Sequence, residues 1–374
     1  GMKTEKKRGG LITRMSQQHI RQQSVWQAWC GEAIACMGLR APWGVFMASF
    51  EPDALKLGRL QPRHLNVRFA DGTLIDTLNA DPLPSTLLLE TEQNDVVVVL
   101  ALPQMYASGG NCLRAEEQAD RPVRFRERWR DIRNLHGDDS RQIAVLHPEL
   151  SLRFSHQDNS NWYTCPVARL QRDAQGHWQL DDEFLPPLLN LQGSVWMMNA
   201  LEQLLTQLRA RLNRLMAMRR ESNQRMADFA VADVALFWLL NALNSAEPVL
   251  ADFLRHPQSP PERLYPELAR LAGSLLTFSL EHQVSAIPLY RHDQLNGVFP
   301  PLFSLLSTLL EASPPSRVAA IALRHDGPLR QWQANLYDSR LREDAIFHLH
   351  APSLLPVTQL HAQFPRTFSA GSPA

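Results

Sequence analysis

The sequence predicts a multidomain α+β protein with an N-terminal β-sandwich, a central antiparallel four-helix bundle and a short, incomplete α/β domain. Short apolar runs bounded by turn residues fill the chain up to about residue 190. Four helical segments with short, proline-marked connections follow, and strand-like runs then resume. The expected domains are an N-terminal arm at 1–39, the sandwich at 40–190, the bundle at 191–313 and the partial α/β domain at 314–374.

The length, charge and cysteine content of the chain exclude some classes of function. The 374 residues suffice for two or three domains with their own cores. Lys plus Arg and Asp plus Glu number 38 each, so no long-range field would draw the whole chain to nucleic acid or to an anionic membrane. The cysteines, which form no CxxC pair, are expected to be reduced and buried in a cytoplasmic protein; they are Cys30, Cys36, Cys112 and Cys165.

The N-terminal arm is basic at its start and polar after it. Its candidate partner-binding residues are Gln17, Gln18, His19, Gln22 and Gln23. A solvated lead-in to the first strand explains the same residues and is the interpretation that their chemistry alone favours. No run typical of a secretory signal follows the basic start, and no segment reaches the roughly 20 apolar residues of a membrane span. We therefore expect a soluble protein.

The sandwich is built from short strands and tight turns. Strands are expected at 45–50, 85–92, 95–103, 143–154 and 162–189. Asp71-Gly72 supplies the positive φ angles of a hairpin turn. Val96–Val99 is apolar on both faces and belongs in the middle of a sheet. Pro186-Pro187 should end strand pairing and the domain, because each proline ring removes a backbone donor.

An arginine-dense stretch interrupts this pattern. Seven arginines lie between Arg114 and Arg133, together with Phe125 and Trp129, which could form a nucleic-acid patch. Nearby Asp and Glu residues offset them nearly one for one. A long solvated β-excursion or loop is therefore the preferred interpretation.

A helix at 192–222 organises the second half of the chain. Its apolar stripe, with alternating steps of three and four residues, is the predicted oligomer interface and consists of Met198, Leu201, Leu205, Leu208, Leu212 and Leu215. The side with Arg209, Arg211 and Arg214 should remain in water. An ordinary core helix of a large bundle has the same pattern and is the interpretation that the stripe alone favours.

Three further helices complete the bundle. They are expected at 226–244, 264–283 and 298–313. Gly273 lies inside the second of these and indicates close helix packing. Pro300 and Pro301 suit the first turn of the last helix, where no amide donor is needed. Beyond the bundle, short strands are expected at 318–326, 330–338 and 344–352.

Few residues of the sequence are candidates for catalysis or metal binding. No phosphate loop, nucleophile elbow or zinc-ligand motif occurs in the sequence. His348 and His350 could share a metal but have no identifiable third ligand. The loop Tyr290–Asp293 gathers titratable groups, either for acid–base work or, as we prefer, as a hydrogen-bonded loop that locks the bundle. We expect no enzyme, no cofactor and no metal.

Several segments occur in a familiar order. LITRMSQQHIRQQ, APWGV, FADGT, YTCPVARL, LDDEFLPPLL, LYPELARLAGSLLTF and IPLYRHDQLNGVFPPLFSLLSTLL resemble successive segments of the TssK family, the baseplate subunit of the type VI secretion system. The similarity extends from Leu11 to about Leu349. Ser16 and Ile20 depart from the proline and phenylalanine of the family's first motif.

The resemblance implies a non-enzymatic structural adaptor. It implies a phage receptor-binding-protein-like shoulder, a helical neck and an α/β head, here short, assembled as a homotrimer along the neck. The implied partners are the wedge proteins TssF and TssG and, through the head, the cytoplasmic parts of TssM and TssL, with neither nucleic acid nor membrane insertion. The implied location is the cytoplasm, peripheral to the inner-membrane secretion complex, in a machine of bacterial virulence and competition.

A different class remains as the alternative. A binding module derived from a phage tail would recognise a carbohydrate or a surface partner through its sandwich. It would need an exposed aromatic groove, for which the available residues are Trp26, Trp29, Trp129 and Trp162.

Overall fold

The computed structural model describes residues 6–7, 38–133, 140–221, 231–312, 323–326, 331–333 and 371. The chain divides into two compact units, residues 1–316 and 317–374. The arm residues predicted to bind a partner, Gln17, Gln18, His19, Gln22 and Gln23, lie outside the described residues, as do Cys30 and Cys36. Cys165 is buried, as expected, and its burial raises the pKa of the thiol, whereas Cys112 is half-buried.

An antiparallel sheet with the strand order β11-β7-β12-β13 lies at the centre of the β region. Its strands are β7 (Asp95–Pro103), β11 (Ser151–Phe154), β12 (Trp162–Arg172) and β13 (Trp178–Leu180). Strand β7 lies between β11 and β12, and Val96, Val98 and Val99 are buried, which confirms the interior position predicted for this run.

A second antiparallel sheet has the order β2-β4-β5. It consists of β2 (Gly44–Phe50), β4 (Pro62–Arg68) and β5 (Leu74–Asp76). The predicted hairpin turn joins β4 to β5, and Gly72 has the positive φ of 86° that it requires. A short helix, α2 (Pro52–Lys56), follows β2. The strand expected at 85–92 is reduced to the pairing of β6 (Leu87–Leu88) with β3 (Arg59–Leu60).

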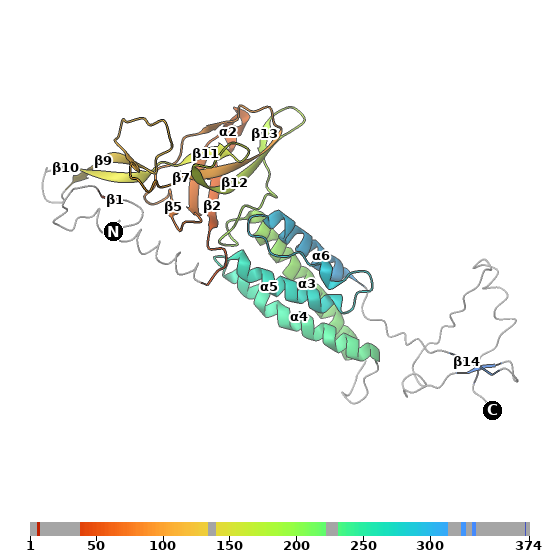
Figure 1. The fold of residues 1–374 in the computed structure, drawn as a ribbon. Helices are drawn as coiled ribbons and strands as arrows, with labels where there is room; N and C mark the ends of the chain where they lie inside the picture. Colours follow the sequence, from red (N-terminus) through yellow and green to blue (C-terminus); the bar gives the residue numbers. More distant parts are fainter. Residues whose placement is uncertain are drawn as a thin grey trace. The chain divides into compact units, whose positions relative to one another are not determined.

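The arginine-dense stretch forms a β-hairpin. Strand β9 (Phe125–Arg133) pairs with β10 (Ser140–Pro148), which agrees with the expected β-excursion. Two short strands flank the hairpin: β1 (Lys6–Lys7) pairs with β10, and β8 (Cys112–Leu113) pairs in parallel with β9. Figure 1 shows β9 and β10 side by side at one end of the β region.

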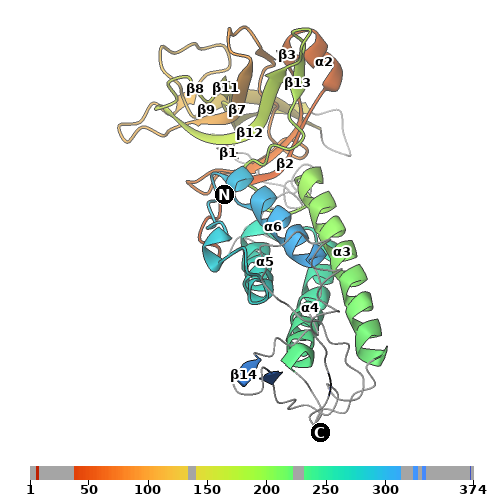
Figure 2. The ribbon, with the colours of Figure 1, turned by 90° about the vertical axis from the view of Figure 1, so that its right-hand side faces the viewer.

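Four long helices follow the β region, and Figures 1 and 2 show them packed alongside one another. They are α3 (Val195–Glu221), α4 (Val231–Arg255), α5 (Pro261–Leu276) and α6 (Phe299–Glu311). Helix α3 contacts α4 and α6, and α5 contacts the same two helices, so the four enclose a common core. The short 3-10 helices η2 (Val284–Ala286) and η3 (Leu295–Gly297) connect α5 to α6.

Local chemistry explains where these helices begin. The Ser194 hydroxyl accepts a hydrogen bond of 3.1 Å from the Met197 amide, which satisfies a donor of the first turn of α3. Pro261 in α5 and Pro300 in α6 occupy first-turn positions that need no amide donor, and the latter confirms the prediction.

Three helix predictions were wrong. The helix expected at 264–283 is α5, which spans Pro261–Leu276 and so ends seven residues earlier than predicted. Helix α4 continues past Asn244 to Arg255 and includes Pro248. One proline removes one helical hydrogen bond, and the buried Leu250 beyond it still packs in the core. Gly273 does not serve close packing, because a Cβ atom built on it would meet no atom within 4 Å.

The second unit is described only in part. Strands β14 (Arg324–Asp326) and β15 (Gln331–Gln333) form an antiparallel pair, with the His325 and Trp332 rings 4.7 Å apart. These strands lie within two of the three strands predicted for this region. The third, with His348 and His350, lies outside the described residues.

Candidate interaction sites

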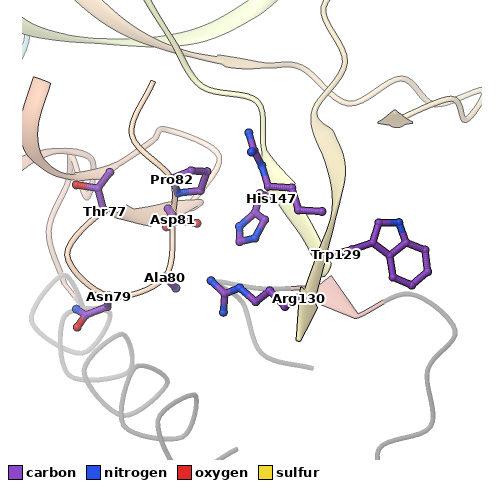
Figure 3. A pocket seen from close by; sticks show the side chains of 9 residues that line it. Thr77, Asn79, Ala80, Asp81, Pro82, Trp129, Arg130 and His147 are labelled. Carbon is purple, nitrogen blue, oxygen red and sulfur yellow. The ribbon is translucent and has the colours of Figure 1, made fainter. Parts of the chain in front are cut away.

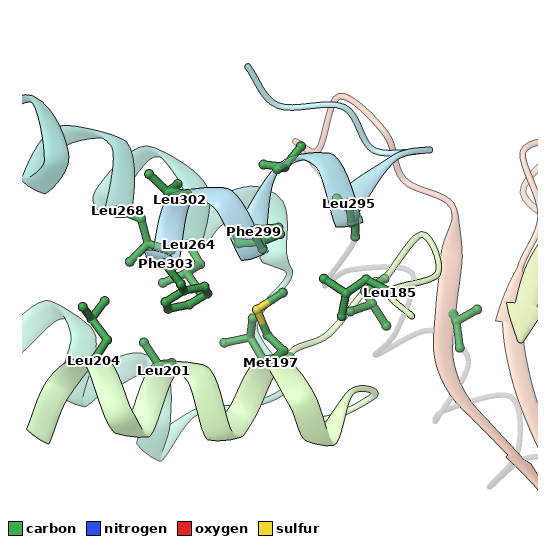
Figure 4. Packing of buried hydrophobic residues seen from close by; sticks show 14 of the residues in the cluster. Leu185, Met197, Leu201, Leu204, Leu264, Leu268, Leu295, Phe299, Leu302 and Phe303 are labelled. Atoms are coloured by element: carbon green, nitrogen blue, oxygen red, sulfur yellow. The ribbon is translucent and has the colours of Figure 1, made fainter. Parts of the chain in front are cut away.

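Helix α3 carries the predicted oligomer stripe. The leucines at 201, 205, 208 and 215 are buried within the single chain. Figure 4 shows Leu201 and Leu204 facing Leu264, Leu268 and Phe303 of α5 and α6. Met198 and Leu212 are partly buried and form the edge of the stripe. The role of the stripe in an oligomer stays a prediction, and its accessible part is this edge.

Arg211 is not on the wet side of α3, so this prediction was wrong. Arg209 and Arg214 are exposed, but Arg211 is only 6% exposed, because it lies three residues after Leu208 and four before Leu215 on the core face. Burial and the nearby Arg214 lower the pKa of its guanidinium. Among the described residues its Nε has no hydrogen-bond partner.

Polar contacts fix the register of α3 against its neighbours. The Arg209 Nη2 lies 2.8 Å from the Glu247 Oε1 on α4. The Gln207 Nε2 donates a hydrogen bond of 3.0 Å to the Ser307 carbonyl on α6. These two contacts orient the apolar stripe of α3 toward the other helices of the same chain.

Helix α4 presents an apolar outer face in addition to its core face. Leu236, Leu239, Leu240 and Leu243 are buried. Val234, Phe237 and Trp238 are exposed near the start of the helix, and Trp238 is 57% exposed. A run that is apolar all round cannot be divided into a core face and an outer face by periodicity alone.

The segment Val234–Arg255 of α4 is also the one part of the described chain that is long and apolar enough for a membrane span. A core helix of a soluble protein meets the same criterion. Leu243 and Leu250 of this segment are buried in the core, but only 28% of the apolar stretch is buried within the chain, so packing in the helical group accounts for part of its composition.

A hydrogen-bonded junction joins the β region to the helices. The Glu262 carboxylate on α5 accepts hydrogen bonds of 2.9 Å from the amides of Arg40 and Ala41. The His292 Nε2 contacts the Trp43 carbonyl at 2.5 Å. Since a carbonyl only accepts, this nitrogen carries the proton, and Nδ1 accepts a hydrogen bond of 2.8 Å from the Tyr290 hydroxyl.

These contacts agree with the interpretation of Tyr290–Asp293 as a locking loop, although the lock holds the β region as well as the bundle. Burial lowers the pKa of His292 and raises that of the Tyr290 hydroxyl, with Glu262 contributing to the latter. Both imidazole nitrogens are occupied by structural partners. The geometry therefore keeps His292 neutral and fixed.

The diproline pairs with β2, contrary to the prediction that it stops all strand pairing. The Val45 amide donates a hydrogen bond of 2.7 Å to the Pro187 carbonyl, and the Leu189 amide donates to the Val45 carbonyl at 2.9 Å. A proline lacks the donor but keeps the acceptor. A Cβ at Gly44 would lie 2.4 Å from the Pro187 oxygen, so glycine is required for this close approach.

The remaining candidates are separated in space or lie outside the described residues. No group of three or more potential metal-ligating side chains occurs within the described ranges, and His348 and His350 are not among them. Of the residues named for an aromatic groove, Trp26 and Trp29 also lie outside the described residues. Trp162 is stacked by the Arg153 guanidinium at 3.9 Å, and Trp129 is exposed on β9.

Comparison with known families gives the class of protein. A family model described as "Bacterial Type VI secretion, VC_A0110, EvfL, ImpJ, VasE" matches residues 19–374. The chain therefore belongs to this family of type VI secretion proteins, as its ordered sequence segments indicated.

Particular relatives carry the name TssK. The chain is 26% identical over 340 residues to the type VI secretion system baseplate component TssK1 of Pseudomonas aeruginosa, covering 89% of this chain and 75% of that protein. It is 49% identical to a chain of a TssK-TssF-TssG baseplate subcomplex solved by cryo-electron microscopy, with a TM-score of 0.69, covering 80% of this chain and 96% of that one. It is 52% identical to TssK of the EAEC type VI secretion system bound to a nanobody, with a TM-score of 0.67 and coverage of 79% and 100%.

Proposed function

We propose that this protein is a non-enzymatic structural component of a type VI secretion baseplate that assembles with TssF and TssG. The observation that carries this proposal is the 49% identity to the chain in the TssK-TssF-TssG subcomplex, since the match covers 96% of that chain. The hydrogen-bonded junction supports a structural role, because it uses the titratable loop groups Tyr290 and His292 to hold two parts of the chain together.

Co-purification tests this proposal. The tagged chain, co-expressed with the TssF and TssG proteins of the same genome, should elute with both as one complex in size-exclusion chromatography. A tagged, unrelated protein with a mass similar to that of this chain is the control for non-specific capture. Elution of the chain without TssF and TssG at micromolar concentration would count against the proposal.

We further propose a homotrimer associated along the helical neck, residues 191–313, below a phage-like shoulder, residues 40–190. The exposed apolar face of α4 supports an intermolecular contact, because Val234, Phe237 and Trp238 form a cluster that water solvates poorly. The partly buried edge of α3, Met198 and Leu212, is a further accessible apolar surface. The buried leucines of the stripe would support the trimer indirectly, because they hold α3 against the other helices of its own chain.

Light scattering on a pair of matched variants tests the trimer. Trp238→Glu places a charge on the outer face of α4 and should convert a trimer to monomer, whereas Asn213→Glu on an exposed position of α3 should leave the mass unchanged. A trimeric Trp238→Glu variant would exclude this face as the contact. A monomeric unsubstituted chain would remove the trimer proposal altogether.

A third proposal concerns contacts with the proteins of the membrane complex. We propose that the C-terminal unit, residues 317–374, acts as a head that engages the cytoplasmic parts of TssM and TssL, which would place the protein in the cytoplasm at the inner-membrane complex. Deletion of residues 317–374 should abolish capture of TssL and TssM cytoplasmic domains and preserve capture of TssF and TssG. Equal capture by both chains would contradict this assignment.

A further inference from the structure

Arg211 on α3 is a buried charged side chain for which the described part of the chain supplies no acceptor. It is 6% exposed, and its Nε atom is enclosed without a hydrogen-bond partner. Neither of its Nη atoms forms a hydrogen bond or an ion pair within the described ranges. Burial, followed by the charge of Arg214, lowers the pKa of the guanidinium, but arginine stays protonated in proteins. The folded chain therefore carries a buried charge at a cost that nothing in these ranges offsets.

The pocket of about 390 Å³ between the β9–β10 hairpin and the loop after β5 differs in this respect (Figure 3). Its lining residues Arg130 and Asp81 both have interactions within the chain. Its buried histidine, His147, is uncharged at neutral pH, because burial, followed by the charges of Arg130 and Arg128, lowers its pKa to about 4. The pocket therefore contains no buried, unpaired charge comparable to that of Arg211.

A carboxylate of opposite charge lies at the end of α6. Glu311 is the last residue of that helix, where the helix dipole disfavours a negative charge, and the last turn contains no basic residue. Its side chain is exposed and forms no ion pair with the described residues. Since Arg214 supplies the charge that acts on Arg211, Glu311 does not compensate Arg211 of its own chain.

Helices α3 and α6 run in the same direction. Near their starts, the Trp196 and Phe303 rings lie 5.9 Å apart. Further along both helices, the Gln207 Nε2 donates a hydrogen bond of 3.0 Å to the Ser307 carbonyl. Both contacts advance in the same sense along the two helices, so residues that follow Gln207 and Ser307 continue side by side.

Arg211 and Glu311 therefore lie at about the same height along the bundle. Each is four residues, or about 6 Å, beyond its helix's member of the hydrogen bond between Gln207 and Ser307. Rotation about an axis along the neck leaves the height of every residue unchanged. Copies related by such an axis can bring Arg211 of one chain to Glu311 of the next.

The exposed apolar cluster of α4 lies in the same half of the bundle. The Leu191 amide, just before α3, donates a hydrogen bond of 2.9 Å to the Pro257 carbonyl, just after α4, so these two helices are antiparallel. The start of α4, with the exposed Trp238, therefore lies beside the end of α3. An apolar contact between copies in this half would exclude water from a nearby ion pair and strengthen it.

We propose that in the homotrimer the Arg211 guanidinium binds the Glu311 carboxylate of the adjacent copy, so that each chain completes the buried charge of its neighbour. The proposal rests on the homotrimer proposed above and names one residue pair of its interface. The two Nη groups of an arginine can donate parallel hydrogen bonds to one carboxylate. In a ring of three copies the contact joins two different surfaces, which suits a cation on one and an anion on the other.

A second copy of the chain is a better acceptor than a partner that binds at intervals. A buried charge without an acceptor destabilises the fold for as long as the acceptor is absent. Another copy is present from synthesis onward, and in an obligate oligomer folding and association stabilise each other. The same contact also removes the unfavourable position of the Glu311 charge at the end of its helix.

Dilution of the full-length chain, followed by mass photometry, tests the pair. Arg211→Glu and Glu311→Arg each place two like charges at every contact, and each should raise the concentration at which half of the trimer dissociates at least tenfold. Arg270→Glu, at an exposed position of α5, should leave that concentration unchanged. Persistence of both variant trimers to the same dilution as the unsubstituted trimer would overturn the proposal. A monomeric unsubstituted chain would instead remove the trimer itself, and this mass is measured first.

Mixing the two variants distinguishes a contact between copies from one within a chain. When Arg211→Glu and Glu311→Arg chains carry different tags and are co-expressed, two of the three contacts in a mixed ring again join opposite charges. We expect trimers with both tags at concentrations at which each variant alone is monomeric. A pair formed within one chain would gain nothing from mixing, so the absence of mixed trimers would contradict the assignment to adjacent copies.

Arg211→Met separates folding from association. Methionine removes the charge but keeps a long apolar side chain, so the dissociated chain should unfold at a higher temperature than the unsubstituted one. The trimer of this variant should still dissociate at least tenfold more readily. A lower unfolding temperature together with an unchanged trimer would show that Arg211 is satisfied within its own chain.

Discussion

A single carboxylate holds the entry of the chain into β2 against helix α5. Glu262 lies in the first turn of α5, where the helix dipole favours negative charge, and it also accepts hydrogen bonds from two amides that no strand satisfies. His292 performs the corresponding task for the Trp43 carbonyl. Two titratable side chains, Glu262 and His292, thus satisfy backbone groups of the segment that leads into β2.

Glu262→Gln tests the first of these contacts. The amide keeps one acceptor oxygen but places an NH₂ group where the second donor needs an acceptor, so we expect the free energy of unfolding to fall by about 2 kcal/mol. Urea unfolding followed by circular dichroism measures the change. The matched control is Glu267→Gln on the same helix, whose partner Arg270 is exposed, and it should change stability by less than about 0.5 kcal/mol. Equal effects would show that the two amides gain nothing from Glu262.

The second contact predicts a pH dependence. Burial lowers the pKa of His292 below its unfolded value of about 6.5, so the unfolded chain binds the proton more readily. The stabilising contribution is complete above that value and is lost as the pH falls below it. Unfolding curves at pH 7.5 and 5.5 should therefore show a smaller loss of stability for His292→Gln than for the unsubstituted chain. His147 contributes a loss of the same sign to both proteins, so the difference isolates His292.

At the scale of elements, the parts predicted correctly are those with local causes. The hairpin at Gly72 and the proline start of α6 depend on backbone preferences of a few neighbouring residues. The helical stripe placed α3 within a few residues of its observed bounds.

Elements that depend on distant partners were not predictable from the sequence. The contact of Glu262 with Arg40 joins positions 222 residues apart, so no local sequence pattern predicts it. The burial of Arg211 and the extension of α4 past Pro248 likewise depend on which helices lie alongside.

Gly273 offers a prediction at this scale. It lies inside α5 with open space around its missing side chain, so Gly273→Ala should raise the free energy of unfolding by roughly 0.5–1 kcal/mol. Thermal and urea unfolding measure the gain. Gly44→Ala is the contrasting variant, because its φ of 137° and the Pro187 carbonyl forbid a Cβ, and it should destabilise the fold. A destabilised Gly273→Ala protein of unchanged mass would indicate a contact on this face that the single chain does not show.

At the scale of the whole first unit, one apolar cluster crosses the junction. It includes Val45 and Leu100 of the sheets, Leu188 of the connecting segment, and Leu201 and Phe299 of the helices. Figure 4 shows Leu185 and Leu295 between the strand segment and the helices. A shared core with hydrogen bonds around it should make the β region and the helices unfold together.

Calorimetry tests this cooperativity. The first unit should unfold in a single transition, with equal calorimetric and van't Hoff enthalpies for its main peak. Leu188→Ala removes buried volume between the two regions and should lower stability by about 2–5 kcal/mol and broaden or split that peak. Leu100→Ala, equally buried but within the β sheets, should lower stability by a similar amount without separating the regions. Two transitions in the unsubstituted protein would mean that the junction positions the helices without coupling their stability to the sheets, and Leu188→Ala would then behave like Leu100→Ala.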